Sequence, residues 1–368
     1  TATIGPGRFK GKGLVVLDEA DVLEGELMGH VGVNISSRRI RQHELGEPSK
    51  VTKPEAWAEW VDQAIPKVVK SFPHVPDDCD DVKLLREVRF LGEMHSDLRR
   101  LQVELPKGNW IYTGKEGEVS FKPVSVTGIA PEVLWGNGGG KWLAMSATFV
   151  SPQFWARDEL GWGEAFETVS MPSTFGVDSR RVLITPVADM SRKMNEREEL
   201  VRGLREVLHR HPDERVLVHT VSYDLAAFVS NRVEDRSVFT YRSATERDRA
   251  IAAFRQSRGG VLVAPSLDRG IDLADDACRV VVVAKVPYPY LGDRQVSARL
   301  YAPGGQTWYG IKTARSLVQM TGRATRHKDD WSISYILDKQ FVTFWNKNRG
   351  LFPEWWTAAL SWRERLRV

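Results

Sequence analysis

Cysteine and long hydrophobic runs are both scarce in this sequence. Its 368 residues include only Cys79 and Cys278, which lie far apart and outside any C-x-x-C pair. A disulfide framework or a cysteine ligand set cannot be built from them, so we expect buried thiols and no iron–sulfur cluster from this chain. No stretch approaches the roughly 18 apolar residues of a membrane span. The opening residues, TATIGPGRFK, lack the apolar core of a signal peptide.

The chain also has little excess charge of either sign. Lys and Arg total 52 against 48 Asp and Glu, so the formal net charge is +4. This balance permits a polyanionic partner without requiring one. The hydrophobic content of 42% and the charged content of 27% are typical of folded chains, and the length fits two or three domains. We expect a cytoplasmic protein, and the frequent Arg and Trp would suit a bacterial or phage gene.

Residues 24–140 are predicted to form a mainly helical module. Within them, 54–72 and 82–101 carry apolar residues at helical spacing. Residues 109–124 alternate apolar and polar side chains around a glycine-containing turn, which is typical of a β-hairpin.

From residue 141 the pattern changes to short Val- and Ile-rich strands that alternate with helical segments. Such alternation indicates an α/β fold whose parallel sheet is covered on both faces. The expected strands are 142–146, 181–187, 215–220, 260–265, 279–286 and 331–337. The expected helices are 194–210, 222–232, 245–257 and 310–325.

An apolar strand near the start of the chain ends abruptly in adjacent carboxylates. Residues 15–21 read VVLDEAD, which places Asp18 and Glu19 directly after the apolar run. Burial of an unpaired carboxylate is costly, so this placement indicates a use for the charge. In nucleotide hydrolases, a strand of this kind delivers an Asp to Mg²⁺ and a Glu to the attacking water.

Polar residues follow other expected strands as well. In open α/β sheets, ligands bind beyond the carboxyl ends of the strands. The candidates there are Ser146 and Thr148 after the strand at 142–146, Ser222 and Tyr223 after 215–220, and Ser266, Gly270 and Asp272 after 260–265. A glycine in the last of these turns permits a tight bend, and the aspartate returns a carboxylate to the cleft.

A helix that ends in QMTGRATRH carries an amide and two guanidiniums. Gln319 and Arg323 are four residues apart and Arg323 and Arg326 are three apart, so one helical face could present all three. Two arginines directed at one point favour an anion such as a triphosphate. The alternative is a solvated arginine-rich face paired with Asp329 and Asp330.

The order of these motifs resembles that of superfamily-two helicases. DEAD, SAT, the Ser-Tyr step, the Ser…Gly-x-Asp turn and Q-x-x-G-R-x-x-R follow one another as motif II through motif VI. The long insertion after DEAD, the phrase GIDL and the later KVPYP are similar to the XPD/DinG-like (Rad3-related) branch. The resemblance implies an ATP-dependent DNA helicase or translocase with ATP and Mg²⁺ as cofactors and single-stranded DNA as partner.

The resemblance also implies three domains. Residues 1–23 and 141–175 would be the remnant of a first RecA-like lobe, 24–140 an inserted arch-like domain and 176–368 the second RecA-like lobe. In the arch-like part, Arg38 and Arg39 would contact phosphates. Its aromatics Trp110 and Tyr112 offer stacking surfaces, whereas Trp57 and Trp60 share a helix face with Ile65 and fit a core better.

Carried over residue by residue, the resemblance assigns nucleotide roles to both ends of the chain. Asp18 would hold the Mg²⁺ of bound ATP, and Glu19 would orient the attacking water. Gln319, Arg323 and Arg326 would close over the triphosphate.

The remaining motif residues would couple hydrolysis to movement or touch nucleic acid. Asp21, which stands where this branch more often has His, would act in coupling together with Ser146 and Thr148. The alternative for the last two is a plain strand-ending turn. Gly270 and Asp272 would sense the nucleotide, although the preceding Asp268 and Arg269 depart from the Trp-Glu or Phe-Glu usual there. The residues implied to contact nucleic acid are Ser222, Tyr223 and Ser266.

A phosphate-binding loop of the form G-x-x-x-x-G-K-[ST] is missing. GNGGGKW at 136–142 imitates one, but Lys141 is followed by Trp142 and the first glycine position is Trp135. We therefore expect a fragment that begins just before motif II, is inactive alone, and needs a chain or segment that supplies the loop. The alternative is a non-catalytic single-stranded nucleic-acid-binding module, or half of a split helicase.

Overall fold

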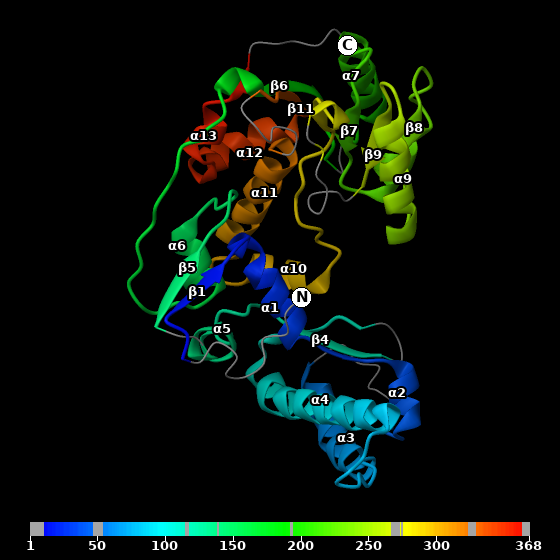
Figure 1. Cartoon of the computed structure of the whole chain (residues 1–368), viewed down its shortest axis with the longest axis vertical. Helices are drawn as coiled ribbons and strands as arrows, with labels where there is room; N and C mark the ends of the chain where they lie inside the picture. Colours follow the sequence, from blue (N-terminus) through cyan, green and yellow to red (C-terminus); the bar gives the residue numbers. More distant parts are fainter. Residues whose placement is uncertain are drawn as a thin grey trace. The chain divides into compact units, whose positions relative to one another are not determined.

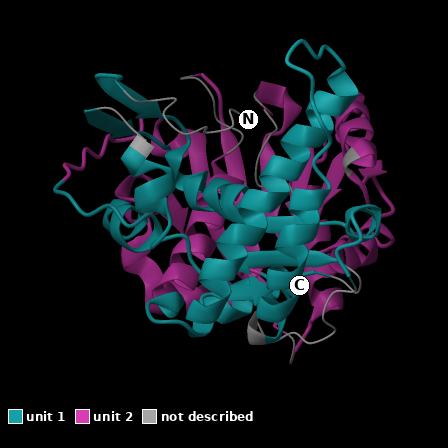
Figure 2. Cartoon of the chain, turned by 90° about the horizontal axis from the view of Figure 1, so that it is seen from below, with its two compact units in different colours: residues 1–147, 152–165, 290–306 teal, residues 148–151, 166–289, 307–368 magenta. Residues whose placement is uncertain are grey.

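The chain folds into two compact units. The computed structural model describes residues 11–46, 54–114, 118–137, 140–191, 194–265, 273, 275–322 and 329–362. The first unit consists of residues 1–147, 152–165 and 290–306, and the second of 148–151, 166–289 and 307–368 (Figure 2). The three-domain division implied by the resemblance stays a prediction.

The first unit contains a parallel strand pair and a helical module with a small antiparallel sheet. Its strands are β1 (Leu14–Leu17), β2 (Val33–Ile35), β3 (Trp110–Tyr112), β4 (Val119–Pro123) and β5 (Lys141–Ala144). Its helices are α1 (Leu23–Val31), α2 (Ser37–Gln42), α3 (Ala58–Lys70), α4 (Val82–Glu104), α5 (Ala130–Val133), α6 (Pro152–Phe154) and α10 (Arg294–Tyr301). Short helical turns complete it: η1 (Ala20–Val22), η2 (Pro54–Trp57), η3 (Leu105–Lys107), η4 (Trp135–Asn137) and η5 (Trp155–Glu159).

Helices α3 and α4 lie side by side and form the body of the helical module (Figure 1). The carboxylate of Asp81 begins α4 by accepting hydrogen bonds from the amides of Lys83 and Leu84, at 2.8 and 3.3 Å. Both helices predicted from the apolar spacing are thus confirmed. The predicted hairpin is confirmed by the antiparallel pairing of β3 with β4, and β2 extends it to the order β2-β4-β3.

Aromatic side chains fill the core of this module. Trp57 is fully buried and Trp60 is nearly so, which confirms the core position predicted for them. The ring of Trp57 stacks on that of Tyr112 with centroids 4.9 Å apart and meets Phe121 edge-on. Trp110 is also fully buried, so the rings of Trp110 and Tyr112 pack against protein in this structure.

The second unit is an all-parallel sheet covered by helices. Its strands are β6 (Arg180–Ala188), β7 (Val216–His219), β8 (Val238–Phe239), β9 (Val261–Ala264), β10 (Val280–Val283), β11 (Ser332–Asp338) and β12 (Leu360–Ser361). Its helices are α7 (Arg197–Arg210), α8 (Tyr223–Ser230), α9 (Ala244–Gln256), α11 (Gly305–Thr321), α12 (Gln340–Asn348) and α13 (Glu354–Thr357), with the turns η6 (Val177–Ser179), η7 (Asp275–Ala277) and η8 (Arg349–Leu351).

The order of the seven strands is β12-β6-β11-β10-β7-β9-β8, and every neighbouring pair is parallel. Strands β7, β9, β10 and β11 are buried along their whole length, as expected for a parallel sheet between two helical layers. The α/β fold class and the strands predicted within this unit are confirmed. The two-residue edge strands β8 and β12 were not predicted.

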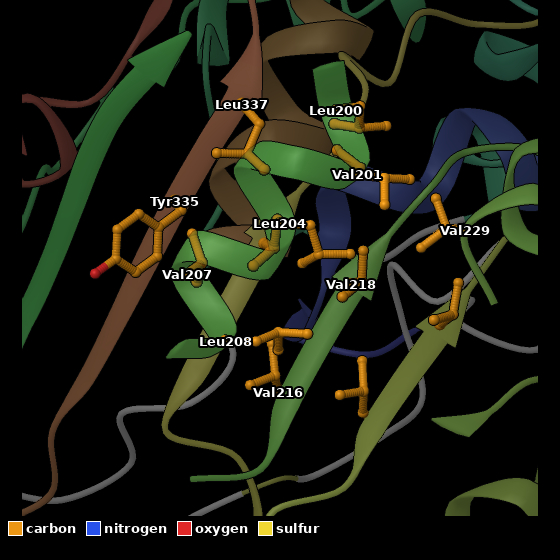
Figure 3. Packing of buried hydrophobic residues seen from close by; sticks show 14 of the residues in the cluster. Leu200, Val201, Leu204, Val207, Leu208, Val216, Val218, Val229, Tyr335 and Leu337 are labelled. Carbon is orange, nitrogen blue, oxygen red and sulfur yellow. The ribbon is translucent and has the colours of Figure 1, made fainter. Parts of the chain in front are cut away.

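Alternate residues of the strands supply the two cores. On one face, Val216 and Val218 of β7 pack with α7 and α8, and Figure 3 shows Leu200, Val201, Leu204, Val207 and Leu208 of α7 in this cluster. On the other face, Leu217 of β7 packs with α9, while Val283 of β10 packs with α11 and α12. The leucines and valines of α7 recur at three- and four-residue intervals, so one stripe of the helix faces the sheet.

The two cysteines differ in burial. Cys278 is buried as expected, whereas Cys79 is only partly buried. Burial raises the pKa of the Cys278 thiol to about 12. Within the described ranges, no helix is both long and apolar enough to cross a membrane.

A partly buried carboxyl in α4 should make the stability of the chain depend on pH. Burial raises the pKa of Asp97 from 3.8 to about 6, although the nearby Arg100 guanidinium, 3.3 Å away, acts in the opposite direction. The folded state then holds this proton more tightly than the unfolded state does. The free energy of unfolding therefore falls as the pH rises from about 4 to about 6 and stays reduced above that window.

We expect Asp97→Asn to raise the free energy of unfolding at pH 8 and to leave it unchanged near pH 4. The gain at pH 8 should be on the order of 1–2 kcal/mol, because solvent screens part of the effect at a side chain that is 29% exposed. Urea denaturation at both pH values measures it, with Asp80→Asn in the exposed loop before α4 as control. An equal change at both pH values would contradict the assignment.

Candidate nucleotide site

The adjacent carboxylates lie at the carboxyl end of a parallel strand pair. Strand β1 pairs with β5 in the register Leu17↔Ala144, and Asp18 and Glu19 come directly after β1. Both are exposed, in agreement with a role toward a ligand. Glu19 has φ 49°, a left-handed conformation that costs an L-residue about 1 kcal/mol or more. The surrounding structure must hold this turn in place.

Residues 18–21, here called the carboxylate turn, are held by the segment that follows β5. The amide of Ala20 donates to the carbonyl of Met145 at 2.9 Å. Asp21 is fully buried, and the hydroxyl of Ser146 donates to its Oδ1 at 2.6 Å. The structure thus brings together two of the predicted coupling residues. It also leaves Asp18 and Glu19 exposed while Ala20 and Asp21 are anchored.

Thr148 belongs to the second unit and contacts another predicted residue of that unit. Gln319 lies in the last turn of α11, and its Nε2 donates to Oγ1 of Thr148 at 2.9 Å. Thr148 is 8% exposed. Within the segment 146–148, Ser146 is hydrogen-bonded to the carboxylate turn of the first unit. Thr148, two residues later, is hydrogen-bonded to α11 of the second unit.

The turn after β7 contains further predicted residues. The hydroxyl of Ser222 accepts a hydrogen bond from the amide of Leu225 at 3.3 Å and so caps α8. Tyr223 is 53% exposed. Val221 has φ 63°, which is a strained conformation for a β-branched residue. The nucleic-acid role of Ser222 and Tyr223 stays a prediction.

Arg38 and Arg39 lie in α2 but differ in their surroundings. Arg38 is exposed. The guanidinium of Arg39 forms an ion pair of 2.8 Å with Glu87 and lies over the ring of Phe90 at 4.0 Å. A phosphate at Arg39 would therefore compete with the Glu87 carboxylate. The predicted residues Ser266, Gly270, Asp272, Arg323 and Arg326 lie outside the described residues.

A stretch in the second half of the chain matches a known protein family. Residues 204–359 match the helicase C-terminal domain family. A stretch of 111 residues is 32% identical to the Gallus gallus Fanconi anemia group J protein homolog. The alignment covers 26% of this chain and 9% of that protein. Another of 109 residues is 28% identical to the Caenorhabditis elegans regulator of telomere elongation helicase 1 homolog, covering 26% and 11%.

Two solved structures share the fold of nearly the whole chain. An XPD helicase structure matches with a TM-score of 0.56 at 17% identity, over 96% of this chain and 68% of that one. The structure of S. tokodaii Xpd4 matches with a TM-score of 0.55 at 14% identity, over 95% and 76%. Residues 204–359 thus match a helicase C-terminal domain, and the fold of the chain is similar to that of XPD helicases. The RecA-like α/β fold with an inserted helical part, predicted from the sequence, is confirmed.

The curated relatives are much longer than the stretches that align with this chain. The chain spans about a tenth of the length of the curated relatives that it matches. Those relatives are animal proteins, so the comparisons lend no support to a bacterial or phage source.

One residue at the site was missed by the sequence analysis. The indole N–H of Trp155 donates to the carbonyl of Ala20 at 2.7 Å, although the two residues are 135 positions apart. No helical or strand periodicity distinguishes Trp155 from the other tryptophans. Its only signal in the sequence is proximity to the SAT segment. Among the described residues, no group of three or more His, Cys, Asp or Glu side chains could hold a metal ion.

The Ser146–Asp21 hydrogen bond should contribute measurably to stability. We expect Ser146→Ala to lower the free energy of unfolding by about 1–3 kcal/mol, because the substitution removes a donor from a buried carboxylate. Urea denaturation measures the change. Ser151→Ala is the control, since the hydroxyl of Ser151 is not hydrogen-bonded to any described residue, and it should change stability by less than about 0.5 kcal/mol.

Proposed function

We propose that the chain is part of an ATP-dependent DNA helicase or translocase that couples ATP hydrolysis to movement on single-stranded DNA. The observation that carries the proposal is the arrangement of the SAT segment. Its Ser146 donates to Asp21 of the carboxylate turn, and its Thr148 accepts from Gln319 of α11. Two motifs at opposite ends of the sequence are thus hydrogen-bonded to one three-residue segment.

The carboxylate turn would serve the nucleotide. Asp18 would hold Mg²⁺ bound to ATP, since carboxylate oxygens are ligands that this ion prefers and the side chain is exposed. Bound Mg²⁺ would neutralise charge on the phosphate oxygens. Glu19 would orient the attacking water and accept its proton. Gln319, with Arg323 and Arg326, would contact the triphosphate, and Gly270 and Asp272 would sense it.

A further segment would have to supply the phosphate-binding loop. The strand pair β1–β5 exposes large apolar side chains: Leu14 is 54%, Val16 50% and Leu143 47% exposed. Parallel sheets are normally buried on both faces, so this face is suited to cover by additional α/β structure. The cover would come from a chain or segment that carries the loop. We expect the present chain alone to hydrolyse little ATP.

The alternative is a module that binds single-stranded nucleic acid without turnover. Exposure of Tyr223 at the end of a sheet strand, and of Arg38 in α2, favours nucleic-acid contact under either function. The two proposals differ in whether nucleotide is hydrolysed once the loop is supplied.

ATP hydrolysis separates the two proposals. With the loop-bearing segment supplied and single-stranded DNA present, we expect turnover that Glu19→Gln lowers by about 10²-fold or more. Arg326→Ala should lower it by about 10³-fold. A coupled phosphate-release assay measures the rates, and Glu26→Gln, an exposed carboxyl on α1, should leave them unchanged. Unaltered turnover in both motif variants would sink the enzyme assignment.

Binding of DNA is tested with the chain alone. We expect fluorescence anisotropy of a labelled single-stranded oligonucleotide to report an affinity that falls steeply as salt is raised. Arg38→Ala should weaken binding at low salt, whereas Arg89→Ala should not, because Arg89 is paired with Glu93 on α4. Absence of binding at low salt would rule out the module that acts without turnover.

A further inference from the structure

The segment that follows β5 is hydrogen-bonded to the carboxylate turn at both of its ends. At its start, Ser146 donates to Asp21, and nine residues later Trp155 donates to the carbonyl of Ala20. Between these two anchors, residues 148–151 belong to the second unit. The chain therefore leaves the first unit and returns to it within a few residues, and it is tied to the same turn before and after.

The bond from Trp155 acts on the peptide group that joins Ala20 to Asp21, one residue beyond Glu19. Ala20 follows Glu19 directly; its amide is held by the Met145 carbonyl at 2.9 Å and its carbonyl by Trp155 at 2.7 Å. Both sides of Ala20 are thus fixed by residues far away in the sequence. This fixation accounts for the persistence of the left-handed conformation at Glu19, with φ 49°.

The indole of Trp155 is itself held in a fixed orientation. It is 6% exposed and meets the ring of Trp135 edge-on, with centroids 6.4 Å apart. Trp135 also contacts Trp142 and Trp162 at 5.0 and 4.8 Å, and its own N–H donates to the carbonyl of Leu160 at 2.7 Å. The Trp155 indole is thus one of four rings packed around Trp135, and a hydrogen-bond donor held in such a cluster has little freedom to move.

We propose that Trp155 is a positioning residue for Asp18 and Glu19. Its indole N–H fixes the Ala20 carbonyl and thereby sets the direction in which the Glu19 carboxylate leaves the turn. The proposal rests on the hydrolytic function proposed above, in which the carboxylate must meet a water molecule. Misplacement of such a group by about 1 Å costs on the order of 10²-fold in rate.

The test compares two identical substitutions within the same aromatic cluster. Trp155→Phe removes the bond to Ala20, whereas Trp162→Phe removes an indole N–H that has no hydrogen-bond partner among the described residues. In the helicase complete with its phosphate-binding segment, we expect Trp155→Phe to lower kcat for DNA-stimulated ATP hydrolysis by about 10- to 100-fold. The KM for ATP should stay within about twofold, and Trp162→Phe should preserve both constants. A kcat for Trp155→Phe equal to that of the unsubstituted protein would overturn the proposal, as would an equal loss in both variants.

A second measurement does not depend on turnover. Hydrogen exchange followed by mass spectrometry on the present chain should show faster exchange over residues 18–22 in Trp155→Phe and unchanged exchange there in Trp162→Phe. If Trp155→Phe folds poorly, replacement of Trp155 by benzothienylalanine removes only the N–H and keeps the ring shape. Unchanged exchange would overturn the positioning role. Altered exchange without ATP hydrolysis in the unsubstituted complete protein would refute the proposed function and leave the anchoring of the turn established.

Discussion

The buried carboxylate of Asp21 is the constraint on which the candidate site depends. A carboxyl group that is fully buried has to be met by hydrogen-bond partners, and Ser146 supplies one from 125 residues away. This requirement fixes the segment after β5 against the turn after β1. As a result, Ala20 and Asp21 are anchored, whereas Asp18 and Glu19 just before them are exposed.

The second unit contributes a rigid frame for the residues at the ends of its strands. Its central strands are buried on both faces, so the turns that follow them start from fixed positions. The amide of Gln319, at the end of α11, meets Thr148 within this unit, and Ser222 is committed to the start of α8. The same residue types that resemble helicase motifs therefore also perform structural tasks, and a substitution at Ser222 would change the helix as well as any ligand contact.

Regular elements were predictable because their signals are local. The spacing of Leu200, Leu204 and Val207 predicts α7 from the sequence alone, and the Val-rich run at 279–286 predicts β10. Trp57 and Trp60 were placed in a core for the same reason. The two-residue strands β8 and β12 were missed, since a strand that short carries no period. Their pairing is imposed by the neighbouring strands β9 and β6.

The sequence by itself determined the alternation of strands and helices and the order of the motifs, which resembles that of XPD/DinG-like helicases. Only the tertiary structure decided which motif residues touch. Ser146 meets Asp21 across 125 positions, Trp155 meets Ala20 across 135, and Gln319 meets Thr148 across 171. Helix and strand patterns arise from backbone preference and one-sided burial over a few turns or residues, so a single sequence displays them. Hydrogen bonds between residues far apart in the sequence depend on how the elements between them pack. No local sequence pattern shows which of these residues will meet.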